Sequence, residues 1–212
     1  MWNEEKLKQQ LGDSWYPILK NEFKMPYMKR LHEFLQQERA ESKTVLPSED
    51  NIFHWFLKCP FEKTMVVLLG IDPALHQSKD IIGTFRQELI DDIYDGIIPT
   101  DNLSLEQIAK QGVLILDTCL TYDLNSSFKH VGQGWEKFVE FAIQRLNNNK
   151  NRITFAIFGE YASASYNKFI DADYHKVIHI PHPRFQASFK GTKPFSKVNS
   201  FLKSMYNTEI NF

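Results

Sequence analysis

Short runs of consecutive apolar residues recur through the middle and the C-terminal part of the chain. They cover residues 64–69, 112–116, 153–158 and 176–180. Because runs of this length lack a polar face, they predict strands that are buried on both sides, as in a parallel sheet. The segments between and after them have apolar residues at helical spacing, which predicts helices over 87–94, 105–111, 135–147, 161–170 and 195–206. Strands and helices therefore alternate, which is typical of an α/β fold.

The N-terminal stretch has a different pattern. From Glu4 to Arg39 the chain is rich in Glu, Lys, Gln and Leu with apolar residues at helical spacing, and we expect breaks near Gly12 and Pro26. A polar loop and then a short aromatic helix around residues 52–57 follow. This pattern predicts helices that precede the sheet rather than strands of it.

Taken together, the pattern predicts a single α/β domain over residues 1–212. Residues 1–60 form a helical N-terminal region, and residues 61–206 form a core with a central four-stranded parallel sheet flanked by helices. The length of 212 residues, with 42% hydrophobic and 24% charged residues, fits one globular domain.

Charge and cysteine content exclude some classes of protein. The formal net charge is -1, which argues against a protein that coats nucleic acid through bulk positive charge but permits a local basic patch. The chain has only two cysteines, which indicates neither a disulfide framework nor a structural zinc site. Its start lacks the layout of a signal peptide and its apolar runs are too short to cross a bilayer, so we expect an intracellular, cytoplasmic protein.

Polar residues follow each predicted strand, where ligands bind in folds of this class. Asp72 follows the first strand, Asp117 the second, Gly159 the third and His182 the fourth. Each alone has an ordinary interpretation, since Asp-Pro and His-Pro are common in turns. Together they indicate an acid/base site, and the chain has no Gly-rich phosphate loop.

The motifs around these residues resemble those of the family-1 uracil-DNA glycosylases, in the family's order. Residues 70–74 (Gly-Ile-Asp-Pro-Ala) resemble G-Q-D-P-Y with Gln and Tyr replaced, and residues 110–121 resemble K-Q-G-V-L-L-L-N-T-x-L-T. Residues 130–136 resemble H-x-G-x-G-W-E, and His182-Pro183 followed by residues 195–199 resembles H-P-S-P-L-S … F-S-K-x-N. The resemblance spans roughly Trp15 to Leu202 and implies an enzyme that flips a base out of DNA and hydrolyses its N-glycosidic bond, leaving an abasic site.

The resemblance also implies roles for individual residues. Asp72 would stabilise the cationic sugar and position the attacking water, while His182 would donate a hydrogen bond to O2 of the leaving base. Phe85 lies fifteen residues after Gly70, at the spacing of the family's base-stacking Phe. Ile71, Ala74 and Asp117 would surround the base. No cofactor and no metal is implied, the partner is DNA, no membrane is involved, and we expect a monomer.

DNA contacts are expected on the loops at the same edge of the sheet. They are assigned to Gly159, Pro183, Arg184, Phe185, Gln186 and His130. Gln186 stands at the offset where the family has its Leu wedge, so the neighbouring Phe185 is the better apolar wedge. The alternative is that Phe185 is buried beneath its loop.

Two departures from the family concern the substrate. Asp117 stands where the family has the Asn that recognises uracil, and Ala74 stands where a Tyr excludes a methyl group at C5. An acidic residue pairs with the amino group of cytosine, and a small one leaves room at C5. The main hypothesis is therefore a glycosylase for C5-modified cytosine, such as hydroxymethylcytosine or larger adducts in phage DNA, with a role in defence. The alternatives are a divergent uracil-DNA glycosylase in which a protonated Asp117 imitates Asn, and a non-catalytic DNA-binding module.

Overall fold

The computed structural model describes residues 2–41, 44–73, 79–98, 104–126, 128–148 and 151–212. Its helices are α1 (Glu4–Leu19), α2 (Pro26–Glu41), α3 (His54–Lys58), α5 (Lys79–Ile93), α6 (Leu105–Lys110), α7 (Trp135–Asn147), α8 (Glu160–Tyr166), α9 (Gln186–Phe189) and α10 (Pro194–Tyr206), with short 3-10 turns at Glu22–Lys24, Glu49–Asn51, Phe61–Lys63 and Asn167–Phe169. No helix of this described part is long and apolar enough to cross a membrane.

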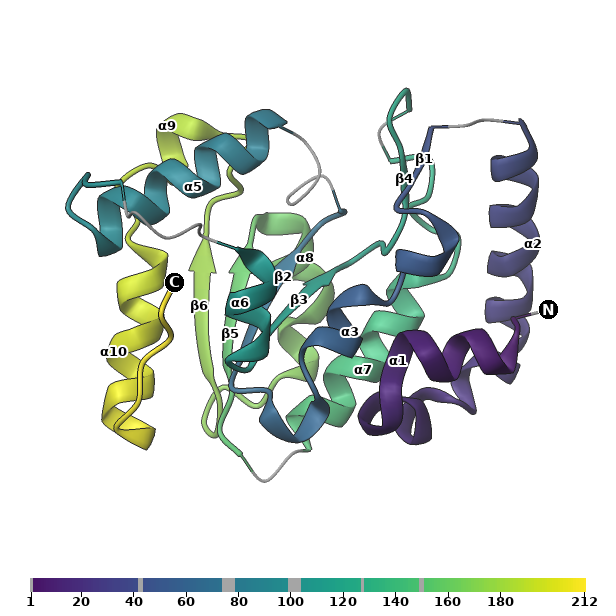
Figure 1. Cartoon of the computed structure of the whole chain (residues 1–212), viewed down its shortest axis with the longest axis horizontal. Coiled ribbons are helices and arrows are strands. Elements are labelled where there is room, and N and C mark those ends of the chain that lie inside the picture. The colour runs from purple at the N-terminus through teal and green to yellow at the C-terminus, as the bar shows by residue number, and fades with distance from the viewer. Residues whose placement is uncertain (1, 42–43, 74–78, 99–103, 127, 149–150) are drawn as a thin grey trace.

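A four-stranded parallel sheet forms the centre of the molecule (Figure 1). Its strands are β2 (Val66–Gly70), β3 (Val113–Asp117), β5 (Thr154–Phe158) and β6 (Lys176–Ile180), in the spatial order β3-β2-β5-β6. All of its pairings are parallel, so the carboxyl ends of the strands share one edge of the sheet. The α/β architecture with a four-stranded parallel sheet is therefore confirmed.

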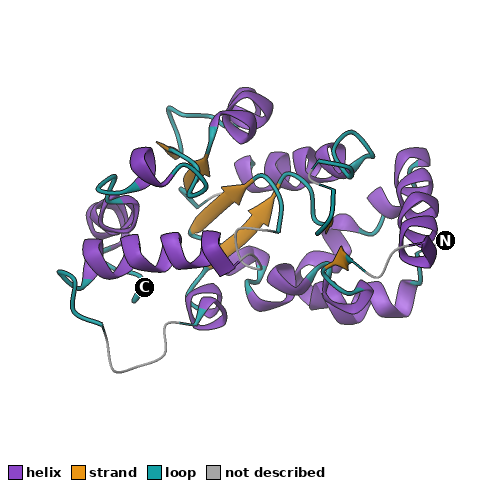
Figure 2. Cartoon of the chain, turned by 90° about the horizontal axis from the view of Figure 1, so that it is seen from above, coloured by secondary structure: helices purple, strands orange, loops and turns teal. Residues whose placement is uncertain are grey.

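Two apolar layers sandwich the sheet. In β2, Val67 and Leu69 belong to the layer that the sheet shares with α1, α2 and α7, while Val66 and Leu68 belong to the layer beneath α5, α6 and α10. Three of the strands, β2, β3 and β5, are buried along their whole length, which explains why their sequences are continuously apolar instead of alternating. Figure 2 shows the strands from above, with helices on all sides.

The predicted breaks in the N-terminal helices are present. Gly12 interrupts α1 with a φ of 66° and a ψ of 180°, a conformation that glycine adopts without steric cost. Pro26 is the first residue of α2, where its fixed φ suits a helix and its missing N–H is not needed. Met25 before it is extended, as expected of a residue that precedes proline.

Two elements differ from the sequence prediction. Helix α5 begins at Lys79 instead of residue 87, because Gly83 lies inside it and does not end it. The segment predicted to be a polar loop contains β1 (Val45–Leu46), which pairs antiparallel with β4 (Tyr122–Asp123). Strands of only two residues are too short to show any hydrophobic alternation, so periodicity could not have revealed this pair.

Helix α5 fixes the chain that follows β6. The buried Glu88 accepts hydrogen bonds from the N–H groups of Gly191 (2.8 Å) and Lys193 (2.9 Å). Asp92 accepts them from the N–H groups of Phe195 (2.9 Å) and Ser196 (3.0 Å) in the first turn of α10. Because carboxylates stabilise the positive end of a helix, these bonds hold residues 190–196 against α5 above the sheet edge.

Candidate active site

Hydrogen bonds join the ends of β2 and β3. The N–H and the hydroxyl group of Thr118 both donate to the carbonyl oxygen of Gly70, each at 3.0 Å. The N–H of Cys119 donates to the carbonyl oxygen of Ile71 at 2.9 Å. These bonds continue the strand pairing for two residues, and they hold Asp72 at the end of β2 beside Asp117 at the end of β3.

Asp117 is the last residue of β3 and is only 2% exposed. Burial, and secondarily the negative charge of Asp72, raise the pKa of its carboxyl group well above the ordinary value of 3.8. Burial therefore favours the protonated form of this carboxyl group over a wider pH range than in an exposed aspartate. A protonated carboxyl has one donor and one acceptor, whereas an ionised one only accepts hydrogen bonds.

Asp72 is 8% exposed and lies among groups that respond to its charge. Besides the carboxyl group of Asp117, it raises the pKa of the Tyr122 hydroxyl, for which burial is the larger cause. The hydroxyl oxygen of Tyr122 is itself buried and has no hydrogen-bond partner among the described residues. Two carboxyl groups and one hydroxyl group therefore lie near one another at the end of the sheet, those of Asp72, Asp117 and Tyr122.

His182 follows β6 and is 4% exposed. Its Nδ1 accepts a hydrogen bond from the backbone N–H of Arg184 at 3.1 Å. Burial, followed by the nearby charge of Arg184, lowers the pKa of His182 to about 4. The ring is thus neutral at physiological pH, and because Nδ1 accepts, the proton resides on Nε2. A neutral imidazole with a protonated Nε2 is a hydrogen-bond donor that needs no positive charge.

Gly159 connects β5 to α8 directly against His182. Its φ of 88° is one that L-residues with a side chain rarely adopt, and an added Cβ would lie 3.2 Å from Cβ of His182. The N–H of Gly159 donates to the carbonyl oxygen of Ile180 at 2.8 Å, so the ends of β5 and β6 are joined as well. Because Gly159 has no side chain, His182 can pack directly against its backbone.

The loop after His182 presents its side chains to solvent. Pro183 is buried, whereas Arg184, Phe185 and Gln186 are exposed. Phe185 is 65% exposed, so the alternative that it is buried beneath the loop is wrong. The guanidinium carbon of Arg184 lies 5.9 Å from the ring centroid of Phe128, which is also exposed. The loop thus combines apolar rings with a positive charge.

Two of the residues proposed for substrate contacts are core residues instead. Phe85 is 6% exposed in α5, with its ring 5.0 Å from that of Phe195 and 6.0 Å from that of Phe158, so its ring packs against other aromatic side chains and is not exposed to solvent. His130 is 2% exposed, its Nδ1 lies 2.8 Å from the hydroxyl oxygen of Thr121, and burial lowers its pKa. A neutral, enclosed ring has no access to a phosphate. Ala74 lies outside the described residues.

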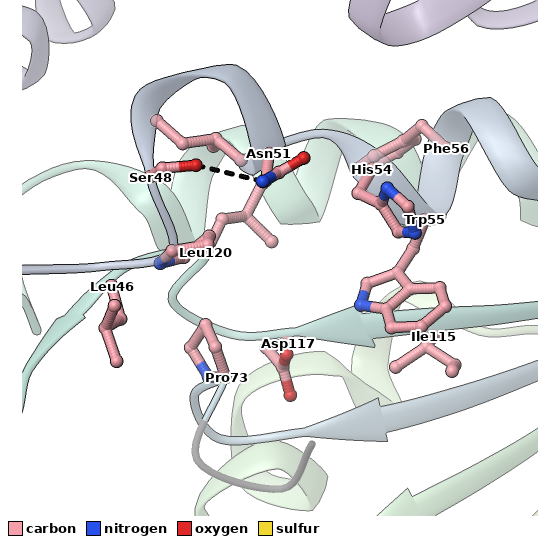
Figure 3. A pocket seen from close by; sticks show the side chains of 12 residues that line it. Leu46, Ser48, Asn51, His54, Trp55, Phe56, Pro73, Ile115, Asp117 and Leu120 are labelled. Atoms are coloured by element: carbon pink, nitrogen blue, oxygen red, sulfur yellow. Dashed lines mark hydrogen bonds between the residues drawn. The ribbon is translucent and has the colours of Figure 1, made fainter. Parts of the chain in front are cut away.

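A pocket lies next to Asp117, and part of its lining was not expected from the sequence (Figure 3). It has a volume of about 460 Å³, and its lining includes Asp117, Pro73, Trp55 and Asn51. Trp55 and Asn51 come from the N-terminal region, which we expected to be a helical extension of the fold. Their sequence neighbourhood carries no catalytic motif. Trp55 reaches the site on α3, which packs against β3, and Asn51 lies in the 3-10 turn just before that helix.

Comparisons with known proteins show the family of this chain. A model of the Uracil DNA glycosylase superfamily matches residues 58–203. The uracil-DNA glycosylase of Lactiplantibacillus plantarum is 35% identical, over 97% of this chain and 96% of that protein. The uracil-DNA glycosylase of Bacillus pumilus is 34% identical, over 97% of each chain.

Solved structures show the same fold. The uracil-DNA glycosylase of mimivirus matches with a TM-score of 0.80 and 21% identity, over 96% of this chain and 88% of that one. A glycosylase from Nitratifractor salsuginis matches with a TM-score of 0.57 and 15% identity, over 95% of this chain and 94% of that one. At these identities the likeness concerns the architecture alone.

Proposed function

Because this chain belongs to the uracil-DNA glycosylase superfamily, we propose that Asp72 and His182 hydrolyse the N-glycosidic bond of a pyrimidine flipped out of DNA. In this reaction the bond between C1′ of deoxyribose and N1 of the base breaks, and its electron pair leaves with the base. The hydroxyl group of a water molecule bonds to C1′, and the remaining proton neutralises the base. The products are the free base and an abasic site.

Two groups carry the chemistry. The carboxylate of Asp72 stabilises the positive charge that develops on the sugar and accepts a proton from the attacking water. His182 donates its Nε2 proton as a hydrogen bond to O2 of the base, where negative charge develops. The neutral state of His182 carries this part of the proposal, because its pKa of about 4 keeps the ring from protonating the base outright at neutral pH.

Asp117 recognises the base. In its protonated form the carboxyl group donates to O4 of uracil and accepts from N3–H. If the carboxyl group rotates so that its two oxygens exchange places, it accepts from the amino group of cytosine and donates to N3. Uracil is the first candidate substrate, because the relatives most similar in sequence are named uracil-DNA glycosylases. C5-modified cytosine is the second, favoured by the acid in place of the family's Asn and by the pocket beside it. A role in defence against phage follows only from the second.

The loop at Arg184–Gln186 contacts DNA. Phe185, at 65% exposure, enters the base stack where the flipped nucleotide was, and Arg184 beside it contacts a phosphate. Pro183 and the N–H groups near Gly159 contact the backbone on either side of the flipped nucleotide.

The proposal is tested by incubating the protein with duplex and single-stranded oligonucleotides that carry uracil, cytosine, or hydroxymethylcytosine. Released bases are identified by mass spectrometry, and abasic sites by cleavage in alkali. Release that disappears in Asp72→Asn supports catalysis. A folded protein that binds these oligonucleotides but releases no base would indicate the non-catalytic alternative.

A further inference from the structure

Apart from Asp117, the residues that line the pocket beside it have no role in the glycosylase reaction proposed above. The pocket lies between the carboxyl end of β3 and the chain that runs from β1 into α3 (Figure 3). Pro73 and Asp117 line it on the side of the sheet, and Ser48, Asn51 and Trp55 line it on the other side. Its volume of about 460 Å³ lies within the range of sites that hold small ligands, roughly 300–1,000 Å³.

The pocket lies beside the residue proposed to recognise the base, which relates it to atom C5 of the flipped pyrimidine. According to the proposed function, on which this inference rests, Asp117 pairs with the group at position 4 of the flipped pyrimidine. C5 is the ring atom bonded to C4, so a substituent on C5 leaves the ring beside the carboxyl group of Asp117. Asp117 also lines the pocket, so the same carboxyl group borders both the pocket and the group at position 4 of the base.

The lining indicates what kind of substituent fits. Among the described lining residues there is no Lys or Arg, so nothing there compensates a phosphate or a carboxylate. Trp55 supplies a flat aromatic surface, and Ser48, Asn51 and His54 supply polar groups around it. Nδ2 of Asn51 donates to Oγ of Ser48 at 2.9 Å, which leaves the Asn51 carbonyl and the Ser48 hydroxyl proton with capacity for further hydrogen bonds.

A polyhydroxylated ring matches this combination. Its C–H face packs on an indole, and its hydroxyl groups exchange hydrogen bonds with amide and hydroxyl side chains. We propose that the pocket is a subsite for a neutral, sugar-sized substituent on C5 of the flipped pyrimidine, with Trp55, Asn51 and Ser48 as its specificity-determining residues.

The experiment compares duplexes that differ only at C5. They carry uracil, cytosine, hydroxymethylcytosine, or hydroxymethylcytosine bearing a hexose on its hydroxymethyl oxygen. Ser48→Trp places an indole in the pocket, while the backbone bond from the N–H of Asn51 to the carbonyl oxygen of Ser48, 2.9 Å, retains the turn. Ser204→Trp makes the same change at an exposed position of α10 and serves as the matched control.

We expect wild type and Ser204→Trp to release the hexose-bearing base. In Ser48→Trp we expect the ratio of kcat/KM for this base to kcat/KM for the base without hexose to fall at least about tenfold. Losses of this size are typical when contacts between a pocket and a substrate group are removed. Asn51→Leu, which removes the amide, lowers the same ratio and replaces Ser48→Trp if thermal melting shows that variant unfolded.

Other outcomes overturn the inference. If uracil or plain cytosine is released but the hexose-bearing base is not, the subsite is refuted and the glycosylase function stands. If Ser48→Trp and Asn51→Leu leave the ratio at its wild-type value, the pocket does not contact the substituent. If wild type releases no base from any duplex, the proposed function fails and the subsite fails with it.

Discussion

The protonation of Asp117 has a consequence that unfolding experiments can measure. Replacing Asp117 by Asn preserves the shape of the side chain and removes its titration. In the wild type, burial and the charge of Asp72 raise the pKa of Asp117 well above 3.8. Between 3.8 and that raised value, the folded chain retains a proton that the unfolded chain releases, so the free energy of unfolding falls as pH rises.

The size of this effect follows from proton linkage. One proton retained on folding changes the free energy of unfolding by about 1.4 kcal/mol per pH unit. The slope depends only on the number of protons retained, while the burial of Asp117, which is 2% exposed, widens the pH range over which it applies. Relative to wild type, we expect Asp117→Asn to gain up to about 1.4 kcal/mol of stability for each pH unit between 3.8 and the raised pKa of Asp117.

Urea unfolding at a series of pH values above 3.8 measures the difference, and titrations common to both proteins cancel in it. Asp13→Asn, at an exposed position of α1, is the matched control and should follow the wild type. Parallel stability curves for wild type and Asp117→Asn would refute a protonated Asp117. The same reasoning predicts that base release by wild type declines as pH rises through the raised pKa, whereas Asp117→Asn releases uracil without that alkaline decline.

Other changes test the remaining groups. Asp72→Asn and His182→Ala should each slow base release by about 10²–10³-fold while the chain stays folded, measured by single-turnover kinetics. Gly159→Ala should destabilise the fold by about 1–3 kcal/mol and slow release, because its φ is strained and its Cβ presses on His182. Gly83→Ala, with no atom within 4 Å of its added Cβ, should stabilise α5 by about 0.5–1 kcal/mol in the same urea experiment. Phe185→Ala should reduce release from duplex DNA more than from single strands, where there is no stack to fill.

The sequence predicted the sheet well because its strands are buried on both sides. A continuous apolar run such as the one in β5 is typical of a strand that helices cover on both faces, and the polar residue after each run marks an edge of the sheet. The motifs then identified Asp72, Asp117 and His182, which the structure places at that edge. The protonation of Asp117 was open in the sequence, because it depends on burial that only the tertiary packing decides.

Side-chain direction and distant packing could not be predicted in the same way. Phe85 matched a motif by its spacing, which could not show that its ring packs against that of Phe195 in the layer beneath α5. Trp55 and Asn51 reach the site through the contact of α3 with β3, which no local pattern encodes. A motif specifies which residue is present, whereas exposure is decided by what packs on it.

In the proposed site, Asp117 and the pocket recognise different atoms of the base. Asp117 contacts N3 and the group at position 4, and the pocket contacts the substituent on C5. The carboxyl group pairs with the edge of uracil or of cytosine, so by itself it would also accept the ordinary cytosine of genomic DNA. Ordinary cytosine has only hydrogen at C5 and makes no contact in the pocket. Contacts made by a substituent there raise the rate only if they are stronger in the transition state, as when they hold the base against Asp117 while the glycosidic bond breaks. Rejection of ordinary cytosine then requires no clash. Ordinary cytosine would be released slowly because it lacks the contacts of the C5 substituent that stabilise the transition state. We therefore expect the hexose-bearing base to have a higher kcat than cytosine, with a smaller difference in KM.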